Sequence, residues 1–153
     1  MAKFTFLKNK KRSKDALIFG VLGDLDELNC FLGWAKIKGK KSDSACAGRL
    51  EKIQRDLIAI SSSVASCGDG SIKKRLASLE SQIKTLEKKV PLTKEFILPG
   101  KSELGVRIHL ARAVARRAER RAVALSRRQK VSPEVLNYLN RLSWFLFMLS
   151  LAL

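Results

Sequence analysis

The sequence is poor in the residues that most enzymes use for covalent and metal-assisted chemistry. It has one histidine and three cysteines, and Cys30, Cys46 and Cys67 do not follow the spacing of metal ligands. A zinc site is therefore not expected, and no nucleophile constellation stands out. The odd number of cysteines favours reduced thiols, so the sequence predicts a cytoplasmic protein.

Long hydrophobic runs are also missing. Residues 1–7 contain no apolar segment long enough for a signal peptide, and the apolar C-terminal run, residues 142–153, covers twelve residues. A membrane-spanning helix needs about 20 residues. We therefore expect a soluble protein without a membrane partner, in which residues 142–153 form the buried end of a helix.

Acidic residues are scarce relative to basic ones. The chain has 14 Asp and Glu against 31 Lys and Arg, which gives a formal net charge of +17. A charge of this size implies an acidic partner: nucleotide phosphates, nucleic acid or an anionic surface. The hydrophobic content of 46% is ordinary, and 153 residues are enough for one folded domain with its own core.

Strand-like alternation is nearly absent, and apolar residues recur instead at helical spacing. Asp24 and Glu27 resemble a capping pair at the start of the first helix, and Ser132 and Pro133 resemble the cap and first position of the last one. The sequence predicts an all-α protein, a five-helix up-and-down bundle over residues 16–153 that follows a basic arm at residues 1–15. The expected helices cover residues 24–37, 44–66, 71–90 and 103–128, and a last segment from residue 132 onward.

Residues 109–121 form the most distinctive helical segment. The segment is rich in alanine, yet it carries five arginines and one acid. Helical spacing places Arg112, Arg116, Glu119 and Arg120 on one stripe beside His109, separate from an apolar stripe. Arginines one turn apart repel each other unless an anion lies across them, and guanidinium groups suit phosphate oxygens. The stripe is therefore either an anion site or a solvated basic face on a core helix.

Two non-helical segments interrupt the pattern. Residues 96–100 (FILPG) are apolar and extended, because Pro99 disfavours helix at the residue before it and Gly100 permits a tight turn. Either Phe96 lines a pocket for a flat apolar ligand, or the segment is a plain connecting loop and Phe96 packs in the protein core. Residues 1–15 carry six basic side chains before Asp15. This segment is either a solvated arm or a segment that contacts polyphosphate or nucleic acid.

Four motifs together carry a resemblance to a known family. They are residues 26–29 (DELN), 96–100 (FILPG), 110–121 (LARAVARRAERR) and 138–143 (YLNRLS), in that order. In this respect the chain resembles the PduO-type ATP:cob(I)alamin adenosyltransferases. The resemblance implies a five-helix bundle that assembles as a homotrimer with active sites between subunits. It also implies transfer of the 5′-deoxyadenosyl group from ATP to the Co(I) of a corrinoid, with release of triphosphate.

The resemblance also assigns roles to individual residues. Arg112 and Asp26 match a pair that forms a salt bridge between subunits, and Phe96 matches an aromatic residue held against the corrin. Of the matched residues, Arg112, Arg116 and Phe96 are the ones expected to act directly in catalysis. The expected ATP contacts are Lys14, Arg116, Arg117, Glu119, Arg120 and Asn140.

The expected chemistry needs no catalytic base, because Co(I) is itself a strong nucleophile. The enzyme has to bring cobalt and the ribose C5′ together and stabilise the departing triphosphate. Arginines and Mg²⁺ are the expected means, with the ion held partly by the phosphates and without a dedicated set of protein ligands. The implied partners are a homotrimer, ATP and cob(I)alamin or a related corrinoid, and a corrinoid-dependent enzyme or a reductase.

Three positions depart from the family pattern. The glycines of the N-terminal ATP loop are replaced around Lys8-Asn9-Lys10, a second glycine after Pro99 is Lys101, and the Asp expected after Ser143 is Trp144. A lysine side chain does not reproduce the backbone N–H contacts that glycine permits. Trp144 is expected to enlarge an apolar surface near the nucleotide motif.

Two functions from different classes follow. The first is a corrinoid adenosyltransferase, which the intact run Arg116 to Arg120 and Asn140 favour. The second is a catalytically weakened relative that binds a nucleotide, a corrinoid or another polyanion, which the altered N-terminal loop and the net charge of +17 favour.

Overall fold

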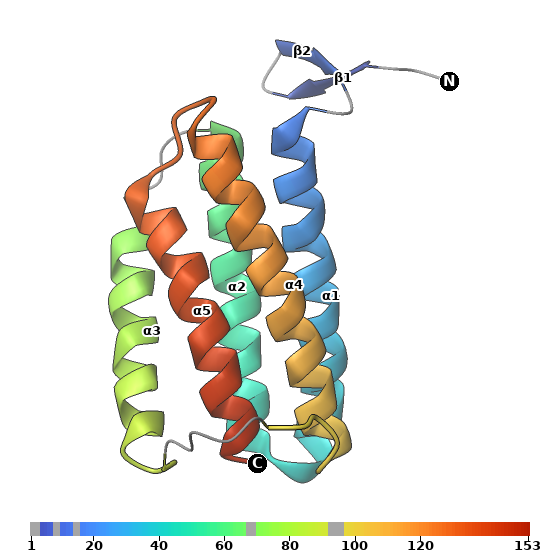
Figure 1. The fold of residues 1–153 in the computed structure, drawn as a ribbon, viewed down its shortest axis with the longest axis vertical. Helices are drawn as coiled ribbons and strands as arrows, with labels where there is room; N and C mark the ends of the chain where they lie inside the picture. The colour runs from blue at the N-terminus through green and yellow to red at the C-terminus, as the bar shows by residue number, and fades with distance from the viewer. Residues whose placement is uncertain (1–3, 8–9, 14–15, 67–69, 92–96) are drawn as a thin grey trace.

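The computed structural model is a bundle of five helices with a small hairpin at one end (Figure 1). It describes residues 4–7, 10–13, 16–66, 70–91 and 97–153. Within these ranges the all-α prediction is confirmed. The helices are α1 (Leu17–Ser42), α2 (Ser44–Ser66), α3 (Ile72–Glu87), α4 (Glu103–Ser126) and α5 (Pro133–Leu151), and the hairpin strands are β1 (Phe4–Leu7) and β2 (Lys10–Ser13).

Successive helices run in opposite directions, as an up-and-down bundle requires (Figure 1). α1 packs against α2 and α4, and α5 packs against α4 and α3. α4 therefore lies between α1 and α5, and its arginine-rich surface faces both. This position allows one helix to present different side chains to two different neighbours.

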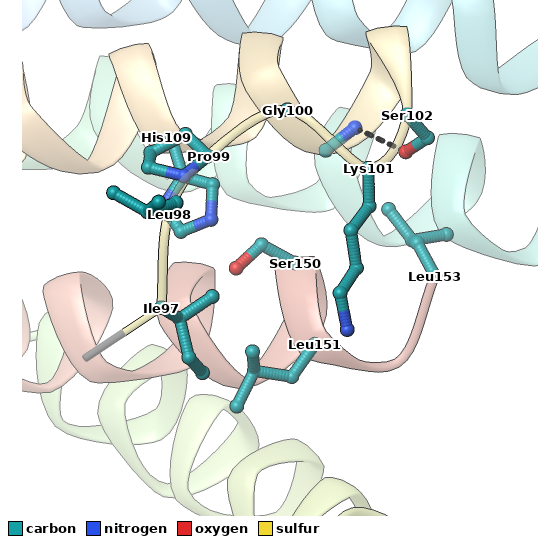
Figure 2. A pocket seen from close by; sticks show the side chains of 11 residues that line it. Ile97, Leu98, Pro99, Gly100, Lys101, Ser102, His109, Ser150, Leu151 and Leu153 are labelled. Atoms are coloured by element: carbon teal, nitrogen blue, oxygen red, sulfur yellow. Dashed lines mark hydrogen bonds between the residues drawn. The ribbon is translucent and has the colours of Figure 1, made fainter. Parts of the chain in front are cut away.

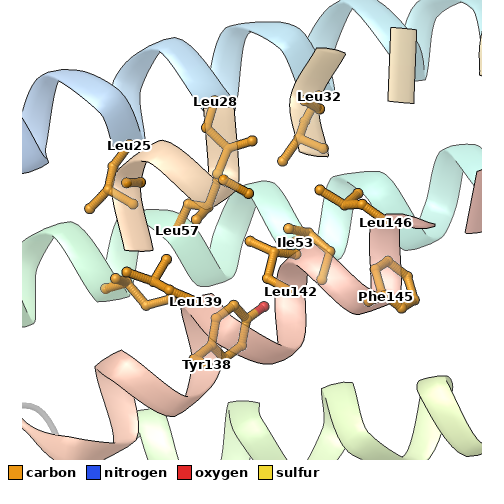
Figure 3. Close-up of a cluster of buried hydrophobic side chains, with 14 of the residues drawn as sticks. Leu25, Leu28, Leu32, Ile53, Leu57, Tyr138, Leu139, Leu142, Phe145 and Leu146 are labelled. Carbon is orange, nitrogen blue, oxygen red and sulfur yellow. The ribbon is translucent and has the colours of Figure 1, made fainter. Parts of the chain in front are cut away.

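The core is built from aliphatic side chains spaced three or four residues apart on each helix. Figure 3 shows leucines of α1 and α5 meeting α2 in the interior of the bundle. The labelled α5 residues Leu142, Phe145 and Leu146 are completely buried, which confirms that the apolar C-terminal run belongs to a core helix. None of the helices in the described ranges is long and apolar enough to cross a membrane.

The predicted cap of the last helix is confirmed, and a second serine caps the arginine helix. The Ser132 hydroxyl accepts a hydrogen bond from the Val135 backbone N–H at 3.2 Å, and Pro133 occupies the first helical position. Ser102 caps α4 in the same way, through the N–H of Gly105 at 3.0 Å. These local contacts fix where the arginine helix and its α5 neighbour begin.

The predicted start of the first helix was wrong. α1 begins at Leu17, so Asp24 and Glu27 lie in its interior and form no capping pair. Asp24 is 3% exposed and accepts hydrogen bonds from arginines of α4. A carboxylate that accepts hydrogen bonds from guanidinium groups of another helix is already satisfied and does not need to cap its own helix.

The N-terminal segment forms an antiparallel hairpin that the sequence did not predict. β1 and β2 pair in register from Phe4 with Ser13 to Leu7 with Lys10, and the hairpin lies beyond the first turn of α1 (Figure 1). Leu7 packs against the bundle core. Lys14 and the Lys8-Asn9 pair lie outside the described residues, so their expected role in the ATP loop stays a prediction.

Candidate functional site

A groove of about 390 Å³ separates α4 from α5 on the outside of the bundle. Arg112 and Arg116 lie one turn apart on the α4 side, as their spacing predicts. Asn140, Trp144 and Phe147 face them from α5 at intervals of four and three residues. The groove thus combines three arginines, of which Arg141 is paired with Glu80, with an amide, a hydroxyl and two aromatic rings.

Arg112 is the more enclosed of the two groove arginines. Its Nε atom is buried and has no hydrogen-bond partner among the residues that the structure describes. Its guanidinium lies 5.6 Å from the centre of the Phe147 ring. Burial, and then the neighbouring Arg116 charge, lower the pKa of Arg112 from its ordinary value. A half-buried cation beside another cation is electrostatically unfavourable, and a bound anion would relieve the repulsion.

Asn140 is held in place by the acid of the arginine segment. Its Nδ2 donates to Oε1 of Glu119 at 2.8 Å, a contact that joins α5 to α4 at one end of the groove. Glu119 therefore orients the amide, and Arg120 next to it is exposed. The structure brings Arg112, Arg116 and Asn140 to one groove and places Glu119 beside them.

Arg117 lies on the opposite face of α4, against α1. Its Nε donates to Oδ1 of Asp24 at 2.9 Å, and its Nη2 donates to Glu27. Arg121, one turn further, donates to the same Asp24 oxygen at 2.8 Å. The hydrogen bond that Arg117 donates to Asp24 is the main reason that the pKa of Arg117 is raised. These partners were missed from the sequence, although two acids three residues apart on one helix are a signal for arginines on another.

Asp26 points away from this cluster. It is exposed and lines a separate groove of about 270 Å³ between α1 and α2, with Ile58 and Ser61. Among the described residues, the ion pairs of α4 arginines involve Asp24, Glu27 and Glu103, and not Asp26. A single chain therefore does not form the expected pair between Asp26 and Arg112.

A second cavity, of about 230 Å³, lies at the N-terminal end of α4 (Figure 2). The segment from Ile97 to Ser102 forms one wall. Gly100 within it adopts a φ of 150°, a backbone conformation that residues other than glycine rarely adopt. The α5 residues Ser150 and Leu151 form the other wall. Phe96, expected at the corrin, lies just outside the described residues, so its position stays a prediction.

His109 lines this second cavity, on the same helix as Arg112 (Figure 2). Its Nδ1 is buried and unpartnered within the described part of the chain. Burial lowers the pKa of the imidazole, and the nearby Arg112 charge lowers it further. The ring is therefore neutral near pH 7, so it adds no charge to the face of α4 that carries Arg112 and Arg116.

The part of the chain that the structure describes offers no ready-made metal centre. Among the described residues there is no group of three or more His, Cys, Asp or Glu side chains that could hold an ion. Cys30 is exposed, Cys46 is buried and both are free thiols; burial raises the pKa of Cys46 to about 11. Cys67 lies outside the described residues.

Comparison with known proteins relates nearly the whole chain to one family. Residues 3–153 match the family model for cobalamin adenosyltransferase. The chain is 34% identical to a corrinoid adenosyltransferase of Bacillus subtilis (strain 168) over 149 residues, which cover 94% of this chain and 77% of the relative. It is 39% identical to the corrinoid adenosyltransferase PduO of Citrobacter freundii, covering 85% of this chain but only 40% of that protein.

Solved structures agree with this assignment. A variant of the PduO-type ATP:corrinoid adenosyltransferase from Lactobacillus reuteri, complexed with cobalamin and ATP, superposes with a TM-score of 0.89 at 28% identity. The match covers 98% of this chain and 87% of that one. A second variant of the same enzyme, complexed with ATP, also gives 0.89, at 29% identity over 97% of this chain and 87% of that one. Because sequence and fold match over almost the full length, the chain belongs to the cobalamin adenosyltransferase family.

Proposed function

We propose that this protein transfers the 5′-deoxyadenosyl group of ATP to the Co(I) of a corrinoid and releases triphosphate, at a site between subunits of a homotrimer. The observation that carries the proposal is the groove with Arg112 and Arg116, two neighbouring cations for which α5 supplies an amide and aromatic rings in place of a carboxylate. The names of its relatives and the ligands of the Lactobacillus reuteri structures support ATP and a corrinoid as substrates.

The two arginines fit the charge that the reaction releases. Cobalt attacks C5′ while the bond between C5′ and the triphosphate oxygen breaks. The leaving triphosphate keeps the electron pair of that bond as negative charge. Guanidinium groups fixed along the path of that charge stabilise the transition state more than the ground state. No residue has to remove a proton, so the neutral His109 and the shortage of nucleophiles agree with the reaction.

Mg²⁺ accompanies ATP in this proposal. Mg²⁺ keeps several waters and is bound through phosphates and one or two carboxylates, so it needs no dedicated protein cage. Glu119 is the carboxylate placed beside Asn140 at the groove. Its carboxylate would help to hold the ion, which would neutralise part of the triphosphate charge.

The separation of Asp26 and Arg112 supports contact with other copies of the chain, and three copies are what the family resemblance implies. Asp26 is exposed, and the Nε of Arg112 has no partner in the described part of the chain, so contact between two copies would satisfy both. Lys14 would contact ATP and Phe96 the corrin. A cytoplasmic location, and delivery of the product to a corrinoid-dependent enzyme or receipt of the corrinoid from a reductase, are part of the same proposal.

A second candidate function has one specific observation in its favour. The net charge of +17, with lysines where the family has loop glycines, suits a relative that binds polyanions without turnover. Binding of that kind weakens steeply with salt and depends little on which arginine is removed. The α4–α5 groove favours the enzyme, because only some arginines of α4 face it.

An anaerobic assay with ATP, Mg²⁺ and chemically reduced cobalamin tests the proposal. We expect the Co(I) absorbance to fall only when protein and ATP are both present. Arg116→Ala should slow the reaction at least about tenfold, the minimum expected for one charged contact to phosphate. Arg128→Ala, an exposed change beyond the end of α4, is the matched control. No ATP-dependent loss with the wild-type protein would contradict the enzyme and favour the polyanion binder.

A further inference from the structure

Trp144 lines the α5 side of the groove, between Asn140 and Phe147 in the sequence and at the position where the family pattern has an acid. Its indole Nε1–H donates to Oε1 of Glu87, at the end of α3, at 2.9 Å. Its ring centre lies 5.5 Å from that of Phe147, with 35° between the planes. The hydrogen bond and the ring contact together fix a half-buried aromatic surface beside Arg112 and Arg116.

This surface faces the positive charge of α4. Phe147 lies against the Arg112 guanidinium, and Asn140 is one turn from Trp144 on α5. A flat ring bound on Trp144 would therefore lie within the same groove as the two arginines. A nucleotide has both parts, a planar base and an anionic tail, and a groove of about 390 Å³ is within the range of small-ligand sites.

We propose that Trp144 is the base-stacking residue of this site and makes it weakly selective among purine nucleoside triphosphates. This inference rests on the proposed function, in which Arg112 and Arg116 hold the phosphates. Stacking tolerates any base, because every base has a π-face. Discrimination between adenine and guanine needs free hydrogen-bonding groups at the edge of the base.

Such groups are few in the described groove, because its polar side chains are already engaged. Apart from the two arginines that face the phosphates, each polar side chain of the lining has a partner in the chain. Asn140 donates to Glu119, Arg141 to Glu80, Ser143 to the backbone carbonyl of Asn140, and Trp144 to Glu87. The groove is therefore suited to recognise a ring by its face and not by its edge.

Removal of Trp34 allows tryptophan fluorescence to report on Trp144 alone. Trp34 is the other tryptophan of the chain, it is 46% exposed on α1, and it too lies under an arginine, with Arg107 4.3 Å from its ring centre. Trp34→Leu leaves Trp144 as the sole tryptophan. We expect ATP and GTP to quench the fluorescence of that variant with dissociation constants within about threefold of each other, a difference of roughly 0.6 kcal/mol.

Calorimetric titrations of the full-length protein with ATP, GTP and inorganic tripolyphosphate then isolate the stacking contact. Trp144→Leu should weaken both nucleotides about tenfold, within the range for base–aromatic stacking, and leave tripolyphosphate unchanged. Trp144→Phe keeps a π-face and should stay within about threefold of the wild type. Circular dichroism of each variant verifies that the bundle is folded, and Trp144→Phe provides the test if the leucine variant is not.

Three results would overturn the inference. Equal weakening of tripolyphosphate would show that Trp144 acts on the phosphate site, and unchanged nucleotide affinity in Trp144→Leu would show that no base stacks there. Strong preference of the wild type for ATP over GTP would contradict weak selectivity. In each case the adenosylation assay can still succeed, whereas a wild-type protein that binds no nucleotide overturns the proposed function as well.

Discussion

The two faces of α4 carry the same residue type and differ in what stands opposite. Toward α1, Arg117 and Arg121 share the buried carboxylate of Asp24, and Arg117 also reaches Glu27. Toward α5, Arg112 and Arg116 meet an amide and aromatic rings. The first face is neutralised within the chain and joins two helices, whereas the second keeps its positive charge available to an anion. The role of an arginine here depends on the neighbouring helix.

The largest effect is expected on the neutralised face. Asp24→Ala removes the shared acceptor of two arginine hydrogen bonds, each worth about 1.5–3 kcal/mol, and should lower the free energy of unfolding by more than the lower figure. The arginines left behind are 38% and 51% exposed, so water solvates part of their charge. Urea denaturation followed by circular dichroism measures this change. A loss below about 1 kcal/mol is typical of an exposed ion pair, and it would mean that the contacts of Asp24 with Arg117 and Arg121 are solvated and contribute little to stability.

Asp26→Ala is the counterpart, two positions along the same helix. Because Asp26 is exposed, the change should leave the helices folded, but it should weaken assembly if Arg112 of another subunit is its partner. Light scattering over a range of concentrations measures assembly, and the exchange of charges in Asp26→Arg with Arg112→Asp should restore it in part. A wild-type monomer at micromolar concentration would rule out the shared site.

The open face is tested by ATP affinity. Arg116→Ala should weaken ATP binding about 10- to 150-fold, the equivalent of roughly 1.5–3 kcal/mol for a charge-assisted contact. Arg117→Ala should instead act mainly on stability, because its guanidinium is held by Asp24 and Glu27. Calorimetry measures the affinity, with Arg127→Ala as control. Equal losses at all three positions would indicate that only general positive charge matters.

The smallest effect is expected from pH, through His109. Burial and Arg112 lower the pKa of this histidine in the folded state, so the unfolded chain binds its proton first as pH falls. Stability should therefore decline as pH is lowered from about 7 through about 6.5, the ordinary histidine pKa, and level off below the folded pKa. His109→Gln should remove this part of the decline in urea midpoints.

The same histidine reports on the open face. NMR titration of the single imidazole should show a higher pKa when ATP or tripolyphosphate is bound, because an anion near Arg112 offsets the charge that lowers the histidine pKa. Binding without a change in that pKa would place the anion away from Arg112.

Much of the fold was accessible from the sequence, and less of the site. The second helix was predicted with the limits 44–66 that the structure shows, and the start of α5 was marked by Ser132 and Pro133. The groove arginines were also predicted, since Arg112 and Arg116 share a stripe by helical spacing alone. The division between Arg116 and its neighbour Arg117 was not, because both belong to one basic run and the acids that separate them lie about 90 residues away on α1.

The sequence by itself determined the helices, the apolar stripes that bury them and the two serine caps, because these depend on contacts within a few residues. It also determined the excess of arginine on α4. Only the tertiary structure decided that Asp24 is a buried acceptor and not a cap, that the segment before α1 pairs as a hairpin, and that Trp144 faces Arg112 and Arg116. Those outcomes depend on which helix packs beside which, and charge pairs and ring contacts form across that distance only when the bundle has assembled.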